Sequence, residues 1–357
     1  MKDIDAYLKN QVDAHLSPSI QYTFFDTEAT IHQMRYGLKN VKAKEPIDSS
    51  TTYNLFSITK TVTALSVLQL VEAGRIELTM PLSSYLPEFP YSKKITVEQL
   101  LSHTSGIPNP LPLKWIHLAE EHARFNRDRF FAEVFKAHPN LDFEPGARCK
   151  YSNLGYVILG QLIEHVSGQL FEDYVKENVV DRSDIESRSL NFRIDSSTHA
   201  TGYHKRWSPS NALLGLLIDK RKYMTKTEGR WQPFKPFYIN GTAYGGMVGS
   251  APGLTKYAQV LLRANSVLLS DKCKQLLFSE CFVQGKPTGM SLAWFTGSLK
   301  GRRYLAHAGG GGGYYGELRI YPDLGAGSLI MYNRSGMTDK RILDRIDSFL
   351  VTEKYLR

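Results

Sequence analysis

The chain has 357 residues, of which 42% are hydrophobic and 11% aromatic. This composition is typical of a folded globular protein and excludes a disordered or fibrous chain. The length exceeds that of a usual single domain, so we expect one large core or two lobes. The longest apolar run, at 212–218, is much shorter than a membrane span, so we expect no stable membrane insertion.

The net charge of +9 results from 44 basic and 35 acidic residues. The basic clusters are short and fit a solvated surface better than attraction to an anionic polymer or membrane, and no nucleic-acid motif is present. Cys149, Cys273 and Cys281 are too few and too scattered for a disulfide framework or a zinc site, which mildly favours a reducing compartment. We therefore expect no metal and no nucleic-acid partner.

The N-terminal stretch MKDIDAYLKNQVDAHL alternates charged and apolar residues and predicts an amphipathic surface helix. It lacks the apolar segment of a signal peptide, so we expect a cytoplasmic protein; removal of a signal would instead fit a periplasmic or secreted one. Two strands are predicted next, at 20–25 and 31–36, separated by a turn at 26–28. An apolar helix then runs from Ser57 to Gly74, a good C-cap.

The middle of the chain is predicted to be helical and rich in loops. Helical spacing occurs at 96–102, 115–136, 153–167 and 169–178. The stretch 203–240 is basic and irregular, and we interpret it as loops near the entrance of a cleft.

The last third predicts a helix at 252–263, followed by strands and a closing helix. The strand candidates lie at 290–296, 303–307, 316–321 and 327–332, and the closing helix at 339–351. Strands at both ends with helices between them predict an α/β fold, an α+β sandwich: an antiparallel sheet from both termini, flanked by helices, with an inserted mainly helical lobe. We expect the sheet lobe at 1–75 and 245–357, the helical lobe at 76–244, and the active site at their interface.

The segment FSITKTVTAL places Ser57 and Lys60 three residues apart, so a helix carries both side chains on one face. The apolar stripe that continues from them predicts a largely buried helix. Burial lowers the pKa of a lysine, and such an amine beside a serine activates the hydroxyl. The alternative, judged from this segment alone, is that Ser57 caps the helix and Lys60 is an ordinary exposed residue.

Two later segments contain further candidate residues. Tyr151 and Asn153 precede an apolar helix and can face one cavity, although Ser152 or Asn153 can equally serve as a simple helix cap. His307 ends a predicted strand and is followed by glycines such as Gly309 and Gly310, whose bare main chain suits an edge that binds a substrate. The alternative for this segment is a flexible turn with an incidental histidine.

The segment LLSHTSGIP contains His103, which sits in a turn beside small polar residues. Its type suggests a general base. A histidine in such a turn more often braces a loop, so we expect a structural role for His103.

S-x-x-K on a helix, then Y-S-N at 151–153, then H-A-G on a late strand resembles the serine β-lactamase and penicillin-binding protein superfamily. The Y-S-N element, LLSHTSGI, the PG…YSN.GY..LG..IE.VSG block and GGMVGSAPGLTKYAQ are similar to the branch that contains class C β-lactamases, DD-peptidases and esterases. The resemblance covers roughly 20–335.

The resemblance implies a role for each candidate residue. Ser57 would attack a carbonyl and form an acyl-enzyme, and Lys60 would take or relay its proton. Tyr151, its pKa lowered by Lys60, would act as general base and then as acid toward the leaving group. Asn153 would hold Lys60 and the substrate amide. His307 stands where many relatives have lysine, and the backbone N–H groups of Gly310 and Ser57 would bind the oxyanion.

Two departures weaken the recognition of a carboxylate. His307 is charged only part of the time near pH 7, and Ala308 lacks the hydroxyl that carboxylate-binding relatives often have there. We therefore expect a serine hydrolase for small ester, amide or β-lactam acyl donors, with esterase-like or D-peptidase-like activity favoured over efficient β-lactam hydrolysis. The alternative is a catalytically silent binding or assembly module. The substrate would be a small molecule or peptide, no cofactor is expected, and the oligomeric state is open.

Overall fold

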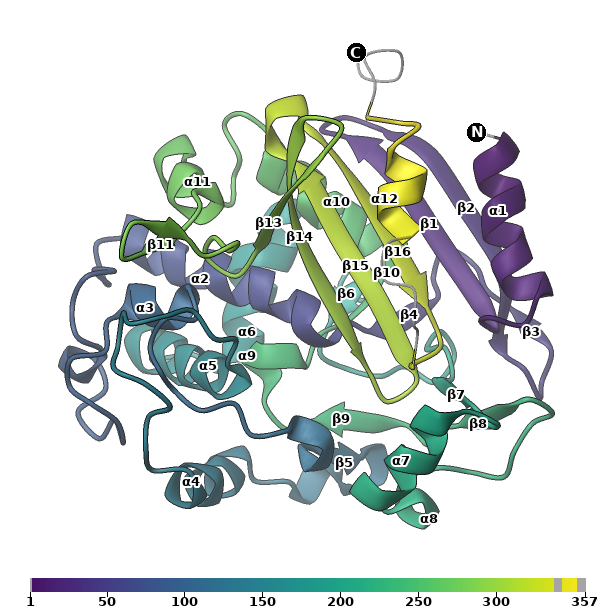
Figure 1. Ribbon diagram of the computed structural model, residues 1–357, viewed down its shortest axis with the longest axis horizontal. Helices are drawn as coiled ribbons and strands as arrows, with labels where there is room; N and C mark the ends of the chain where they lie inside the picture. Colours follow the sequence, from purple (N-terminus) through teal and green to yellow (C-terminus); the bar gives the residue numbers. More distant parts are fainter. Residues whose placement is uncertain (1, 337–341, 352–357) are drawn as a thin grey trace.

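The computed structural model describes residues 2–336 and 342–351. Seven strands form the main sheet: β1 (Ser19–Asp26), β2 (Thr30–Asn40), β3 (Glu45–Pro46), β13 (Phe295–Leu299), β14 (Arg302–Gly311), β15 (Tyr314–Tyr321) and β16 (Ala326–Tyr332). Every neighbouring pair is antiparallel, in the order β13-β14-β15-β16-β1-β2-β3. Strand β1 pairs with β16, so the two ends of the chain build one sheet, as the sequence predicts (Figure 1).

Helices cover both faces of this sheet. Because side chains alternate along a strand, Ile20, Tyr22 and Phe24 of β1 point to one face, where they pack with α1 (Lys2–Asp13) and α12 (Ile342–Asp347). The opposite face packs against α10 (Ala251–Leu262) and α2 (Thr59–Glu72) in the larger hydrophobic core. The α/β class predicted from the sequence is confirmed.

Helix α2 lies inside the molecule. Its residues 59–70 are all buried. It packs against helices that lie, along the chain, between the N-terminal and C-terminal strands of the sheet, and it also belongs to the core that covers one face of the sheet. The helices in that region are α3 (Val97–Leu101), α4 (Arg127–Ala137), α5 (Asn153–Ser167), α6 (Phe171–Val175), α7 (Pro209–Leu217), α8 (Lys220–Tyr223) and α9 (Thr242–Gly245). The division into two lobes stays a prediction.

Short strands connect these helices. They are β4 (Thr52–Asn54), β5 (Ile116–Leu118), β6 (Leu190–Asn191), β7 (Tyr203–Lys205), β8 (Trp231–Pro233), β9 (Phe237–Ile239) and β10 (Val248–Ser250), and they form the small sheets β4-β10-β6, β5-β9 and β7-β8. Helix α11 (Asp271–Phe278) and the hairpin of β11 (Phe282–Val283) and β12 (Lys286–Pro287) follow α10.

Three sequence-based expectations need correction. The stretch 115–136 is α-helical only from Arg127, after β5 and a 3₁₀ helix at Ala119–Arg124, because β5 pairs with the distant β9 and so overrides local propensity. The stretch 203–240, interpreted as loops, contains α7, α8 and three short strands. The strand predicted at 290–296 begins only at Phe295. The predicted start of the closing helix, at 339–341, lies outside the described residues.

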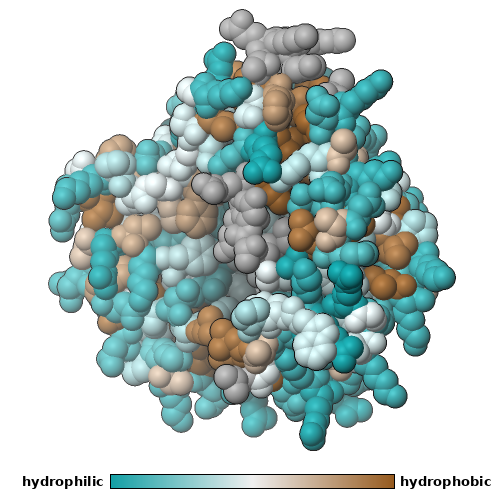
Figure 2. Space-filling view, turned by 45° about the vertical axis from the view of Figure 1, so that its right-hand side comes forward, coloured by the Kyte–Doolittle hydropathy of each residue, from teal (hydrophilic) through white to brown (hydrophobic). Residues whose placement is uncertain are grey.

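The face of the molecule seen in Figure 2 is mainly hydrophilic, with separate hydrophobic patches. Within 2–336 and 342–351, no helix is long and apolar enough to cross a membrane.

Candidate active site

Ser57 lies in a single 3₁₀ turn, Phe56–Ile58, directly before α2. The residue before it, Phe56, has φ of 47°, in the left-handed region that residues with a side chain rarely adopt. This conformation costs about 1–2 kcal/mol. The rings of Phe237 and Tyr314 pack around Phe56 and hold it there. The turn places Ser57 at the edge of a cavity.

Lys60 is completely buried in the first turn of α2. Its amine Nζ lies 3.2 Å from Ser57 Oγ, 2.8 Å from Asn153 Oδ1 and 2.7 Å from the carbonyl oxygen of Tyr244. Burial lowers the pKa of this amine well below its usual value. None of its hydrogen-bond partners is a carboxylate. The site therefore favours the uncharged form of this lysine more than water does.

Tyr151 lies next to Ser57 and Lys60. Its hydroxyl lies near the side chain of Ser57, and the Lys60 amine lies 5.0 Å from the centre of its ring. Burial raises the pKa of the phenol, and the nearby hydroxyl of Ser57 offsets only part of that effect. The expectation that Lys60 lowers this pKa is therefore wrong, because the effect of burial on the phenol exceeds that of its neighbours.

His307 lies on β14 beside Tyr151, with Nε2 3.2 Å from the phenol oxygen. Its other nitrogen, Nδ1, donates to the carbonyl oxygen of Ala293. Burial is the main cause that lowers the pKa of His307, to about 3. The imidazole is therefore neutral at physiological pH, with Nε2 free to accept the phenol hydrogen.

Asn153 is the first residue of α5, and its amide is oriented by two partners. Its Nδ2 donates to Asn109 Oδ1 over 3.1 Å, which turns its Oδ1 toward Lys60. Ser152 is the cap of this helix, since its hydroxyl accepts from the N–H of Gly155 at 3.0 Å. The capping interpretation thus holds for Ser152, while Asn153 faces the cavity.

The glycines after His307 allow β14 to lie against the turn that holds Ser57. A Cβ on Gly309 would come 2.0 Å from the carbonyl oxygen of Leu55 and 2.9 Å from the backbone nitrogen of Ser57. A residue with a side chain at 309 would therefore push the strand away from the turn. Gly310 lines the same cavity as Ser57.

His103 packs beneath Tyr151 and away from Ser57. The two rings stack with their centres 4.4 Å apart, and His103 Nδ1 accepts from the backbone N–H of Ser152 at 3.1 Å. Burial lowers its pKa well below the usual value. These contacts fit a residue that fixes the 151–153 segment in place.

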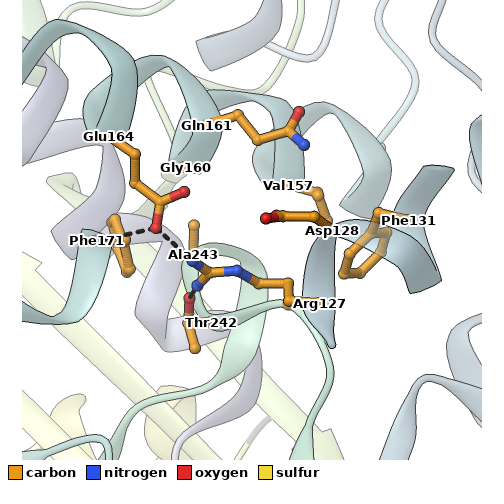
Figure 3. Close-up of a pocket in the computed structure, with 11 residues that line it drawn as sticks. Arg127, Asp128, Phe131, Val157, Gly160, Gln161, Glu164, Phe171, Thr242 and Ala243 are labelled. Atoms are coloured by element: carbon orange, nitrogen blue, oxygen red, sulfur yellow. Dashed lines mark hydrogen bonds and ion pairs between the residues drawn. The ribbon is translucent and has the colours of Figure 1, made fainter. Parts of the chain in front are cut away.

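Helix α9 brings in a contact that the sequence did not reveal, the carbonyl oxygen of Tyr244 on Lys60. The start of α9 is held by Arg127, which donates to Thr242 Oγ1 over 2.7 Å (Figure 3). Arg127 in turn pairs with Glu164 and Glu172. This hydrogen bond comes from the backbone of residue 244, so no side-chain motif could have marked it.

A sequence model of the Beta-lactamase family matches residues 4–352. The chain belongs to the beta-lactamase family. Penicillin-binding protein 4* of Bacillus subtilis (strain 168) is 24% identical over 334 residues, which cover 91% of this chain and 70% of that protein. Protein flp of Staphylococcus aureus (strain MW2) is 31% identical over 150 residues, which cover 40% of this chain but only 29% of flp.

Solved structures of this beta-lactamase fold agree with the architecture. The octameric penicillin-binding protein homologue from Pyrococcus abyssi has a TM-score of 0.79 at 22% identity, covering 98% of this chain and 77% of that one. The D-amino acid amidase from Ochrobactrum anthropi SV3 has a TM-score of 0.76 at 17% identity, covering 97% and 95%. The family match and the grouped side chains together support a serine hydrolase.

Proposed function

We propose that this protein is a serine hydrolase that forms an acyl-enzyme at Ser57 and acts on small ester or amide donors. The observation that carries the proposal is the 3.2 Å contact of Ser57 Oγ with the buried amine of Lys60, with the phenol of Tyr151 nearby. In the first step the serine oxygen bonds to the acyl carbon and the leaving group departs. Water then breaks the new ester and regenerates Ser57.

Lys60 is the group best placed to accept the serine proton. Asn153 Oδ1 and the Tyr244 carbonyl can only accept, so together they occupy two amine hydrogens of Lys60. In the charged form the amine also donates to Ser57 Oγ, 3.2 Å away; in the neutral form it has two hydrogens and one lone pair, which is left to accept the proton of Ser57. General-base help of this kind is worth about 10²- to 10⁴-fold in rate.

Tyr151 then acts as a neutral phenol. Its raised pKa makes it a donor of hydrogen bonds, suited to protonating or holding the leaving group. His307 Nε2 fixes the direction of the phenol hydrogen before the substrate enters. Backbone N–H groups at Ser57 and Gly310 remain the expected oxyanion donors, each worth about 10²- to 10³-fold in rate.

A second candidate activity is hydrolysis of D-amino acid amides or peptides. It is supported by similarity to a D-amino acid amidase and to a D-stereospecific amidohydrolase from Streptomyces sp.. Efficient β-lactam hydrolysis is disfavoured, because a neutral His307 offers no positive charge to a substrate carboxylate.

Covalent labelling tests the proposal against a silent binding module. A fluorophosphonate probe should add one adduct to the intact protein, and mass spectrometry should place it on Ser57. The adduct should vanish in Ser57→Ala and persist in Ser66→Ala, a buried serine farther along α2. An intact, folded protein that takes up no label would favour the silent module.

A further inference from the structure

The cavity beside Ser57 has a volume of about 350 Å³ and extends from the serine to α7. No Asp, Glu, Lys or Arg occurs among its lining residues within the described chain. This is unusual for a chain with 44 basic and 35 acidic residues. The space that receives the substrate is therefore uncharged on every described wall.

The walls are hydrocarbon and come from three separate segments. Leu113 and Ile116 line one part, Leu214 and Leu217 of α7 another, and Phe234 and Phe237 a third. Gly312 makes room for this arrangement, since a Cβ there would come 2.3 Å from the ring of Phe237. Such walls gain free energy by removing apolar surface of a ligand from water.

Three polar side chains of the cavity, His204, Ser210 and Ser335, bind one another. His204 is held by two hydroxyls, with Nδ1 2.8 Å from Ser335 Oγ and Nε2 3.1 Å from Ser210 Oγ. Burial lowers the pKa of His204 to about 4, so the ring is uncharged near neutral pH. A carboxylate or an ammonium group in this cavity would lose its hydration and find no opposite charge on the described walls.

We propose that the acyl group accepted by this cavity is apolar and uncharged, a hydrocarbon chain or ring without a free carboxylate or ammonium group. The inference rests on the proposed acyl-enzyme at Ser57 and specifies the class of its donor. It favours simple carboxylic esters over the D-amino acid amides and carboxylate-bearing peptides of the second candidate activity.

A series of matched esters tests it. The p-nitrophenyl esters of hexanoic acid, 6-aminohexanoic acid and adipic acid (the mono-ester) all have six-carbon acyl groups, whose far ends carry a methyl, an ammonium and a carboxylate. We expect kcat/KM for hexanoate to exceed that for acetate by at least about 10-fold, because each added methylene fills apolar space. Both charged esters should fall about 10²-fold below hexanoate. Equal values across the series, or a preference for either charged ester, would overturn the inference.

A charge placed in the wall should change this preference. Leu214→Asp should raise the ratio of kcat/KM for 6-aminohexanoate to that for hexanoate by at least about 10-fold. Because the ratio compares two substrates on one sample, partial loss of folded protein does not affect it. Ala212→Asp is the matched control, since it adds the same charge to the same helix at an exposed residue outside the lining. Equal ratios in the two variants would contradict the assignment of α7 as the wall.

The outcomes separate the two proposals. If Ser57 is acylated equally fast by all esters, the acyl-enzyme stands and the inference alone fails. If Ser57→Ala hydrolyses hexanoate as fast as the parent, or no ester leaves an adduct on Ser57, the proposed function fails and the inference fails with it.

Discussion

His307 Nε2 lies 3.2 Å from the phenol oxygen of Tyr151, while Nδ1 of the same ring donates to the carbonyl of Ala293. A carbonyl can only accept, so Nδ1 carries the hydrogen and Nε2 accepts from the phenol. With a pKa of about 3, the ring adds no charge beside Tyr151 near neutral pH. His307 and Tyr151 are thus both uncharged, and a lysine at position 307 would instead offer a permanent positive charge to a substrate carboxylate.

The first prediction is that charge at 307 controls acceptance of carboxylate-bearing donors. His307→Lys should raise kcat/KM for nitrocefin, which carries a carboxylate, by at least about 10-fold. His307→Gln, which removes the ring but adds no charge, is the control and should give no such rise. Equal nitrocefin rates in the two variants would show that charge at this position does not limit the reaction.

The second prediction concerns the pH dependence of acylation. The neutral amine of Lys60 is the active form, and burial lowers its pKa, so that form is present at pH values well below 10.5. The rate of acylation should be full above the pKa of Lys60 in the folded protein and fall as pH drops through it. Stopped-flow measurement of p-nitrophenol release provides the profile. A rate that rises only near the ordinary pKa of lysine would contradict the role given to the amine.

Lys60→Arg is the matched control for that experiment. A guanidinium keeps its charge at every accessible pH, so it has no lone pair to offer to Ser57. We expect acylation to fall by about 10²- to 10⁴-fold at all pH values. A variant that kept the parental rate would exclude Lys60 as the base.

The third prediction separates Tyr151 from another buried tyrosine close to Lys60. Tyr151→Phe should lower the acylation rate by about 10²-fold or more, since it removes the hydroxyl that lies near Ser57. Tyr156→Phe is the control: the ring of Tyr156 lies 5.5 Å from the Lys60 amine, but its hydroxyl donates to the Leu101 carbonyl. That control should lose stability, by about 1 kcal/mol, and keep its turnover. Similar turnover losses in both variants would argue for a general packing effect.

The fourth prediction uses two adjacent glycines of β14. Gly309→Ala should lower both stability and turnover, because its Cβ would meet the rigid backbone at Leu55 and Ser57. Overpacking of this kind costs about 1–3 kcal/mol. Gly310→Ala is milder, since its Cβ would meet the ring of Tyr315 at 3.2 Å. Thermal unfolding and ester hydrolysis measure both effects, and an unchanged Gly309→Ala enzyme would refute the close contact of strand and turn.

The sequence predicted the parts of the fold that local pattern determines. The predicted bounds of the helix at 153–167 and of the strands at 316–321 and 327–332 agree with the observed elements within two residues. Ser57, Lys60, Tyr151, Asn153 and His307 lie together around one group of hydrogen bonds, as the order of the motifs implied. Their catalytic roles stay predictions.

The features that the sequence missed depend on contacts between distant segments. The uncharged phenol of Tyr151 follows from burial and from a neutral His307, and neither can be calculated before the chain is folded. The apolar wall formed by α7 was hidden in a basic, irregular stretch whose charged residues surround a short apolar helix. The Tyr244 contact involves only a backbone carbonyl.

The last prediction follows from Arg127, whose side chain ties the start of α9 to Glu164 (Figure 3) and also pairs with Glu172. Arg127→Met should lower stability by about 3–5 kcal/mol, because it leaves two partly buried carboxylates without their cation. It should also lower kcat, since α9 carries the carbonyl that orients the Lys60 amine. Denaturant unfolding and steady-state kinetics measure the two effects.

The double variant Arg127→Met with Glu164→Gln removes one unpaired carboxylate together with the cation. It should recover part of the lost stability but not the lost kcat, because Thr242 still lacks its donor. Recovery of both quantities together would mean that Arg127 supports only the fold. If kcat stays low in the stabilised double variant, Arg127 positions α9 for catalysis in addition to supporting the fold.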